Sequence, residues 1–335
     1  MFAPRRYGKT SLVFKVIEEL ETQDVQCIYF DFSPVFSIES FVTSYLDAIK
    51  KKQTNLQKFI QTFAGLIRNI RPKLTFDLSS NPEFGIELLE QSISVQTLSD
   101  VLDLPEKLSQ NGKRIVVVFD EFQEITKFDK FNFESLLRSK IQQQNVNYLF
   151  LGSRTHLLND MFNNKKRAFY NSASPIQLNT LPREETVMYL QRQFRSSDIA
   201  LSRENALLLI EEAGDIPYYI QFLAAEIWQY VVNYVHDVNS EIIKICSKKI
   251  IELKQDYYFE LFDRQSVLQK KIPKALVVSG ENIFSKQYSQ QFRLSTASSI
   301  QKALVVLMEN GLVYKTQNTY FISDPFFKRY VQNYA

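Results

Sequence analysis

A short stretch near the start of the chain most limits how the protein can fold. Residues 3–12 read Ala-Pro-Arg-Arg-Tyr-Gly-Lys-Thr-Ser-Leu and run directly into an apolar pattern with helical spacing, Val13, Val16, Ile17 and Leu20. This is the ending of a P-loop, whose pattern is G-x-x-x-x-G-K-[ST]. Ala3 occupies the position of the first glycine of this pattern. The alternative is a chance loop before a helix, and only further motifs distinguish the two.

In a P-loop, backbone N–H groups surround a phosphate chain and the N-terminus of the next helix adds partial positive charge. Gly8 would let the loop approach the phosphates, and Lys9 would reach the β- and γ-phosphates. The Thr10 hydroxyl would bind Mg²⁺. The predicted nucleotide-binding set also includes their neighbours in the loop, Pro4, Arg5, Arg6, Tyr7 and Ser11.

A second motif is the run Ile115-Val116-Val117-Val118-Phe119-Asp120-Glu121. A continuous β-branched apolar run predicts a strand buried on both faces of a parallel sheet. Ligands of open α/β sheets bind where such strands end. This is a Walker B pattern, in which Asp120 would hold Mg²⁺ and Glu121 would orient or deprotonate the attacking water. A strand that merely leaves the core into a polar turn is the alternative, and the upstream Gly-Lys-Thr argues against it.

Residues 146–154 predict another buried strand with a polar end. In P-loop ATPases the strand after the Walker B strand often ends in a residue that senses the γ-phosphate. Arg154 would stabilise negative charge there, and Ser153 would donate a hydrogen bond. The alternative is that Arg154 is a loop arginine paired with a carboxylate.

Alternating strands and helices over residues 1–178 predict an α/β, doubly wound parallel sheet, with a short last strand at 175–178. A small β-hairpin over residues 74–89 is inserted into this pattern. From Pro182 onward the pattern is helical only. The expected helices cover 36–70, 98–110, 131–144, 183–195, 202–213, 217–235 and 241–262.

The end of the chain predicts a winged helix, with helices over 268–279, 285–292 and 297–310 and a wing hairpin over 312–322. From Lys271 onward, eight Lys and Arg residues face three Asp and Glu residues. Residues 271–335 are therefore predicted to contact double-stranded DNA or a protein partner, and both interpretations stay open.

Length and composition suit this division. A chain of 335 residues predicts two or three domains, for which we place boundaries at 1–180, 181–262 and 263–335. The net charge of +3 is too small to indicate nucleic acid by itself.

Cys27 and Cys246 lack metal-ligand spacing and indicate a reducing compartment. The sequence shows neither a membrane-spanning apolar run nor a signal peptide, so we expect a cytoplasmic protein without membrane contact.

Taken together, these motifs resemble the archaeal-type ATPases of the STAND branch of AAA+-related P-loop proteins. The resemblance covers essentially the whole chain and rests on residues 3–12, 118–124, 151–154, 213–219 and 324–327. It implies ATP as the nucleotide, Mg²⁺ held by Thr10 and Asp120, and Arg154 as the sensor. It also implies that Pro217, in a helical lid, packs near the adenine. Ala3 in place of glycine occurs in this family's pattern.

The expected function is a switch that binds ATP, hydrolyses it slowly and couples its nucleotide state to the winged helix; a nucleotide-dependent oligomer is one form that such a switch takes. Two alternatives stay open. One is a DNA-binding ATPase helper of a mobile element or of a replication or regulatory system. The other is an inactive nucleotide-binding scaffold.

One departure from the family concerns the strand that leads into the P-loop. Only Met1 and Phe2 precede Ala3, which is shorter than a typical strand. That strand lies inside the sheet in this family, and its absence would leave buried backbone groups unpaired. We therefore expect an apolar β-branched run upstream of Met1.

Overall fold

The computed structural model describes all residues except 53–69, 77–81, 89–92, 111, 129 and 235–236. The chain forms two compact units. The N-terminal unit contains Met1–Ala3 and Lys9–Leu178, and the C-terminal unit contains Pro4–Gly8 and Asn179–Ala335. No helix among the described residues has the length and apolar character that crossing a membrane requires.

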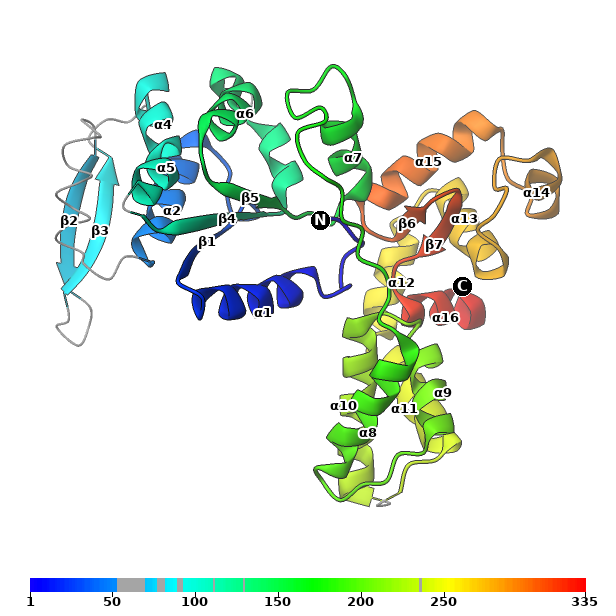
Figure 1. Ribbon diagram of the computed structural model, residues 1–335. Coiled ribbons are helices and arrows are strands. Elements are labelled where there is room, and N and C mark those ends of the chain that lie inside the picture. Colours follow the sequence, from blue (N-terminus) through cyan, green and yellow to red (C-terminus); the bar gives the residue numbers. More distant parts are fainter. Residues whose placement is uncertain (53–69, 77–81, 89–92, 111, 129, 235–236) are drawn as a thin grey trace. The chain divides into compact units, whose positions relative to one another are not determined.

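A parallel three-stranded sheet forms the centre of the N-terminal unit, in the order β1-β4-β5 (Figure 1). The strands are β1 (Val25–Asp31), β4 (Arg114–Asp120) and β5 (Asn147–Phe150). The expected parallel α/β sheet is therefore confirmed. The short last strand expected at 175–178 is absent from the described residues, where Gln177 makes only an isolated parallel bridge to Phe2, which also bridges Gly152.

Helices cover both faces of this sheet (Figure 1). On one face α1 (Lys9–Glu21) packs Val13 and Ile17 against Cys27 and Val118. The opposite face carries a larger core, to which three helices contribute and in which the aromatic residues Phe30, Phe41, Tyr45 and Phe119 are buried. These helices are α2 (Ile38–Lys50), α4 (Val95–Leu102) and α6 (Phe133–Gln143).

Several local elements of this unit differ from the sequence expectation. The single helix expected over 98–110 divides at Asp103 into α4 and α5 (Leu104–Ser109), because Pro105 lacks an N–H to continue the first helix. The helix α7 (Thr155–Asn163) follows β5 and was not anticipated. Two 3₁₀ segments, η1 (Phe122–Lys127) and η2 (Lys130–Asn132), connect β4 to α6.

The inserted hairpin is confirmed: β2 (Ile70–Phe76) pairs antiparallel with β3 (Pro82–Leu88). The helix expected over 36–70 is observed as α2, and its expected continuation over 53–69 lies outside the described residues. Within α2, Phe41, Tyr45 and Ile49 are buried, at the four-residue spacing of one helix face.

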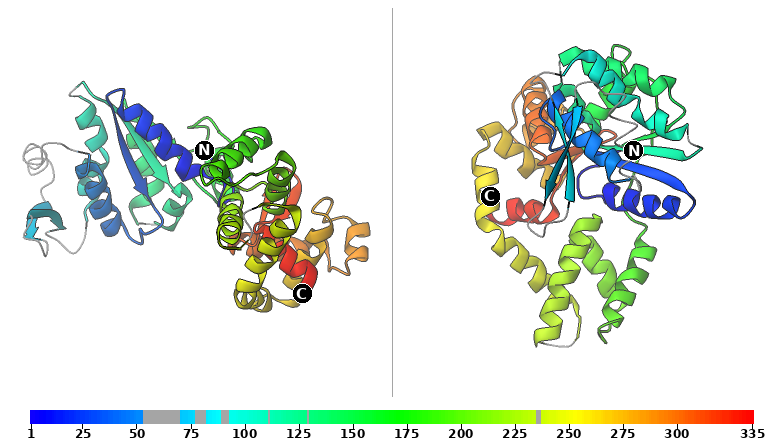
Figure 2. Two further views of the ribbon diagram at one scale, coloured as in Figure 1. Left: turned by 90° about the horizontal axis from the view of Figure 1, so that it is seen from below. Right: turned by 90° about the vertical axis from the view of Figure 1, so that its left-hand side faces the viewer.

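In the C-terminal unit, four helices pack as a bundle in every view (Figures 1 and 2). They are α8 (Arg183–Arg195), α9 (Arg203–Glu212), α10 (Pro217–Tyr234) and α11 (Ser240–Leu253). Pro217 begins α10, as expected of a residue whose fixed φ suits a first turn. The helix expected over 241–262 breaks at Lys254, which separates α11 from α12 (Gln255–Asp263).

The winged-helix elements also lie in the C-terminal unit. The helices are α13 (Val267–Val278), α14 (Lys286–Gln291) and α15 (Ala297–Glu309), and the wing pairs β6 (Val313–Thr316) with β7 (Thr319–Ile322). Gly280 allows close approach to the wing, because a Cβ there would lie 1.8 Å from the Tyr320 carbonyl oxygen. A last helix, α16 (Pro325–Tyr334), was not anticipated; it buries Phe326 and Phe327.

Candidate active site

The carboxylate of Asp120 is the centre of the candidate site in the N-terminal unit. Asp120 ends β4 and is 4% exposed. Its Oδ2 accepts hydrogen bonds from Thr10 Oγ1 at 2.8 Å and from the Tyr29 hydroxyl at 2.7 Å. Its Oδ1 accepts from the backbone N–H of Glu121 at 2.8 Å. The structure therefore brings the hydroxyl and the carboxylate that the motifs single out for Mg²⁺ into direct contact.

Tyr29 is a member of this group that the sequence analysis missed. It lies on β1, whose last residue Asp31 pairs in register with Asp120. Burial raises the pKa of the Tyr29 phenol, and the neighbouring Asp120 carboxylate raises this pKa further. Tyr29 therefore stays a donor to Asp120. A tyrosine hydroxyl two residues before the end of β1 was the available signal.

Glu121 follows in a left-handed backbone conformation, with φ 48° and ψ 43°. This conformation is uncommon for a residue with a Cβ, and strained backbone of this kind is found at functional sites as well as in turns. One carboxylate oxygen, Oε2, accepts from the Ser153 hydroxyl at 2.8 Å and from the Ser153 backbone N–H at 3.3 Å. The side-chain amide of Gln123 donates to the same oxygen. The sequence analysis gave Gln123 no role.

Arg154 lies at the N-terminus of α7, close to a carboxylate. Its guanidinium Nη1 is 4.0 Å from Glu124 Oε1, and Glu124 also pairs with Lys127. In this structure Arg154 lies beside a carboxylate, which is the arrangement that the alternative interpretation expects. Its side chain is 31% exposed, so water screens this contact.

Lys9 is the first residue of α1 and is 6% exposed. Its ammonium group donates to the carbonyl oxygen of Ala3 at 2.9 Å, so the lysine lies back along its own loop. Thr10 is half-buried beside it, and Ser11 is exposed. Lys9, Thr10, Asp120, Glu121 and Ser153 thus all belong to the N-terminal unit.

The remaining loop residues, Pro4–Gly8, belong to the C-terminal unit. The Arg6 guanidinium lies 5.0 Å from the ring centroids of both Tyr218 and Tyr219, donates to the Tyr219 hydroxyl, and approaches Asp324 Oδ2 at 3.4 Å. The Arg6 carbonyl accepts from the Tyr218 N–H at 3.3 Å.

The contact of Arg6 with Tyr218 and Tyr219 brings two predicted site residues, Arg6 and Pro217, close together within the C-terminal unit. Pro217, the buried first residue of α10, directly precedes the two tyrosines that hold Arg6. Tyr7 is buried, and its hydroxyl is 3.1 Å from that of Tyr314 on β6. Gly8 has a φ of 80°, which favours glycine, whereas Arg6 adopts a φ of 72° despite its side chain. Pro4 is half-buried and Arg5 is exposed.

Asp324 is a third residue, after Tyr29 and Gln123, without a role in the sequence analysis. Its Oδ1 accepts from the N–H groups of Phe326 and Phe327 and so caps α16, and its Oδ2 accepts from the Tyr258 hydroxyl at 3.2 Å. Burial raises the pKa of this carboxyl, although the helix N–H groups and Arg6 oppose the rise.

The oxygen atoms at Thr10 and Asp120 suit magnesium, which prefers oxygen ligands and usually binds one or two carboxylates, substrate phosphates and water. Among the described residues there is no group of three or more His, Cys, Asp or Glu side chains that could hold a metal on its own. A metal here would therefore need phosphate and water oxygens in addition to Thr10 and Asp120.

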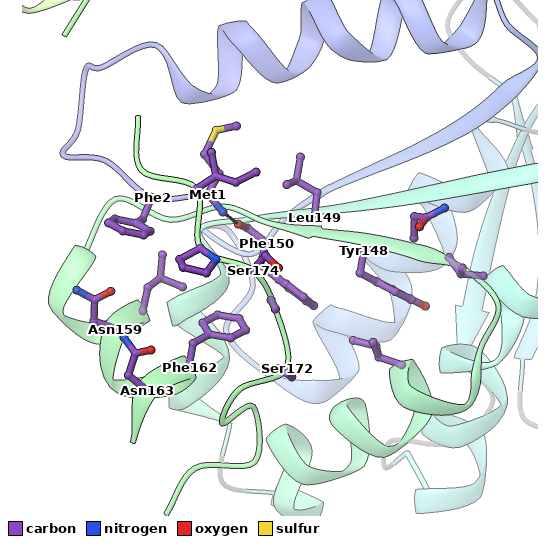
Figure 3. Close-up of a pocket in the computed structure, with 17 residues that line it drawn as sticks. Met1, Phe2, Tyr148, Leu149, Phe150, Asn159, Phe162, Asn163, Ser172 and Ser174 are labelled. Carbon is purple, nitrogen blue, oxygen red and sulfur yellow. Dashed lines mark hydrogen bonds between the residues drawn. The ribbon is translucent and has the colours of Figure 1, made fainter. Parts of the chain in front are cut away.

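A separate pocket of about 390 Å³ lies beside β5 in the N-terminal unit (Figure 3). It is lined by Phe2, Tyr148, Phe150, Phe162 and residues 172–176, among others. The Met1 amino group donates to the Phe150 carbonyl at its edge, at 2.6 Å. None of the described side chains that line this pocket is charged, and none belongs to the predicted site, so we assign it no acid–base chemistry.

Comparison with known proteins adds to this geometry. A family model described as a probable winged helix domain matches residues 237–333. Among solved structures, the Walker-type ATPase of Pyrococcus abyssi superposes with a TM-score of 0.67 at 17% identity, covering 99% of this chain and 89% of that chain. The chain has an AAA+-like fold with a C-terminal winged helix.

A second solved structure with this AAA+-like fold is the ORC2 protein of Aeropyrum pernix, described as ADPNP–ADP complexes. Its TM-score is 0.55 at 14% identity, and the match covers 99% of this chain and 85% of that chain. The search of curated protein sequences found no match. At these identities the likeness concerns the fold, so the activity is argued from the site.

Proposed function

We propose that this protein binds ATP with Mg²⁺, hydrolyses it slowly, and acts as a STAND-type switch whose nucleotide state controls the winged helix. The observation that carries the proposal is the 2.8 Å hydrogen bond from Thr10 Oγ1 to Asp120 Oδ2. It joins a P-loop hydroxyl to a Walker B carboxylate across 110 residues of sequence. The AAA+-like fold and the ADPNP–ADP complexes of a protein with that fold support the choice of nucleotide.

In this proposal each side chain has one task. Lys9 binds the β- and γ-phosphates, and Thr10 and Asp120 hold Mg²⁺, which supplies positive charge to the phosphate oxygens when bound. Glu121 orients the attacking water and accepts its proton. Ser153 and Arg154 contact the γ-phosphate. Pro4–Gly8 and Ser11 contribute backbone and side-chain contacts to the nucleotide, and Pro217 packs near the adenine.

The coupling to the winged helix rests on residues 4–8. We place an ATPase core at 1–180, a helical lid at 181–262 and the winged helix at 263–335. Arg6 of the phosphate loop contacts Tyr218 and Tyr219 of the lid and Asp324 next to the wing. A triphosphate that reorders this loop would change those contacts, and ADP would change them less. A nucleotide-dependent oligomer is one way to use such a change.

Two substitutions test the activity. Lys9→Ala should abolish ATP binding, because it removes the charge directed at the β- and γ-phosphates. Glu121→Gln should keep binding and lose hydrolysis, because it preserves shape and removes the base. Binding is measured by calorimetry and turnover by phosphate release, with Lys15→Ala, an exposed lysine on α1, as the control. The proposal is wrong if both variants hydrolyse ATP like the parent. ATP binding without turnover in the parent would instead favour the inactive scaffold.

A DNA-binding ATPase helper is the second candidate, and the excess of positive charge after Lys271 favours it. The exposed face of α15 includes Ser298, Gln301 and Lys302, together with Val305 at 42% exposure. Salt-dependent binding of a duplex that weakens on Lys302→Ala or Arg293→Ala would favour this function. Arg329 is a poor choice for such a test, because it already pairs with Glu212.

A further inference from the structure

We propose that Gln123 is a positioning residue for ATP hydrolysis: its side-chain amide holds the Glu121 carboxylate in the orientation that the reaction needs. The inference rests on the proposed function of Glu121 as the base. It concerns a residue that follows the Walker B strand by three positions and that would not touch the nucleotide itself.

The contact geometry supports this role. Three donors converge on a single carboxylate oxygen, Glu121 Oε2: the amide of Gln123, the hydroxyl of Ser153 and the backbone N–H of Ser153. The other carboxylate oxygen receives none of these three bonds. A base anchored through one oxygen keeps its second oxygen for a water molecule in a fixed direction. Glu121 has a left-handed backbone, and these three bonds hold its carboxylate beside Ser153.

The burial of the Gln123 amide lowers the folding stability of the protein. The residue is 1% exposed, and among the described residues its Oε1 is the buried side-chain oxygen without a hydrogen-bond partner. A buried polar atom without a partner lowers stability, and an apolar side chain of similar shape would avoid this cost. Fold stability alone therefore does not explain a glutamine at this position, whereas its N–H group does.

Gly152, in the segment that follows β5, leaves room for the Gln123 side chain. A Cβ on Gly152 would lie 2.2 Å from Gln123 Oε1 and 2.4 Å from Leu158 Cδ1. Gly152, directly before Ser153, thus accommodates Gln123 beneath the strand end. The amide nitrogen must face the carboxylate, because the opposite orientation would place two oxygens against each other.

The test is a double-mutant cycle on the full chain. Gln123→Met keeps the length of the side chain and removes both the donor and the unpartnered oxygen. We expect kcat to fall between about ten- and one-hundredfold, as for a misplaced catalytic group. We expect the ATP dissociation constant to stay unchanged and Tm to stay level or rise, because the unpartnered oxygen is gone. In a Glu121→Gln background, Gln123→Met should change the residual rate no further.

The matched control is Gln96→Met, which removes a glutamine–carboxylate hydrogen bond of 2.8 Å to Asp100 on α4, away from the strand ends. It should leave kcat unchanged. A Gln123→Met protein with the parent's kcat overturns the positioning role while the proposed function stands. A fall in residual rate of the same factor in the Glu121→Gln background also overturns it, because the effect then does not pass through Glu121. A parent that binds no ATP overturns the proposed function itself.

Discussion

At the scale of single residues, the candidate site depends on carboxylates that are held from several sides. Asp120 receives bonds from Thr10, Tyr29 and the next backbone N–H, and Glu121 receives bonds from Ser153 and Gln123. Bonds of this number orient a carboxylate before any ligand arrives. Preorganised groups of this kind account for much of the rate enhancement of enzymes that transfer phosphoryl groups.

Arg154 provides a residue-scale prediction. If it contacts the γ-phosphate, Arg154→Ala should weaken ATP binding by about 1.5–3 kcal/mol, the range of hydrogen bonds to charged groups, and ADP binding by much less. Calorimetric titration with each nucleotide measures both losses. Glu124→Gln is the matched control, because it removes the carboxylate that lies 4.0 Å from Arg154 and keeps the arginine. Equal losses for ATP and ADP in Arg154→Ala would limit Arg154 to its pairing with Glu124.

At the scale of elements, α16 shows how one side chain can fix a helix. Asp324 caps the helix through the N–H groups of Phe326 and Phe327, which satisfies two of the donors that a helix start leaves unpaired. Its other oxygen accepts from Tyr258 on α12 and lies near Arg6. The helix start, α12 and the loop residue therefore share one carboxylate.

This carboxylate leads to a prediction about pH. Because burial raises the pKa of Asp324 in the folded state, the folded protein holds this proton at a pH where the unfolded chain, with an ordinary pKa of about 3.9, has lost it. The contribution of Asp324 to stability is therefore greatest below the unfolded pKa, and it falls as pH rises through the folded pKa. Relative to Asp324→Asn, which keeps a capping side chain, the parent should gain Tm as pH falls from 7 toward 4. Thermal unfolding followed by circular dichroism measures this; a pH-independent difference between the two proteins would contradict it.

At the scale of the whole molecule, nucleotide binding should appear as added stability. A ligand that binds only the folded state at one hundred times its dissociation constant adds about 2.7 kcal/mol. We therefore expect Tm to rise by several degrees with Mg²⁺ and ATP. Lys9→Ala should lose this rise and Lys15→Ala should keep it, because Lys15 pairs with Glu18 on the exposed side of α1. An equal rise in all three proteins would show that the effect does not come from the P-loop.

The sequence by itself determined the class of fold and the motifs. The helices α8 to α10 and α13 to α15 and the strands β4 and β5 follow from apolar spacing, and the Gly-Lys-Thr and Asp-Glu motifs each lie within adjacent residues. Such signals are local, since they depend on neighbours in the chain. For that reason Thr10 and Asp120 could be named as partners, although 110 residues separate them.

The tertiary structure decided which other side chains join them. Tyr29 meets Asp120 because β1 and β4 pair in register, and Gln123 reaches Glu121 because a 3₁₀ turn follows β4 and Gly152 leaves space. Arg6 meets Tyr219 across 213 residues. These contacts depend on strand register, backbone conformation and packing between distant segments, which no local pattern encodes. The helix break at Lys254 was missed because continuous apolar spacing crosses it, whereas the break at Asp103 has a local signal in Pro105.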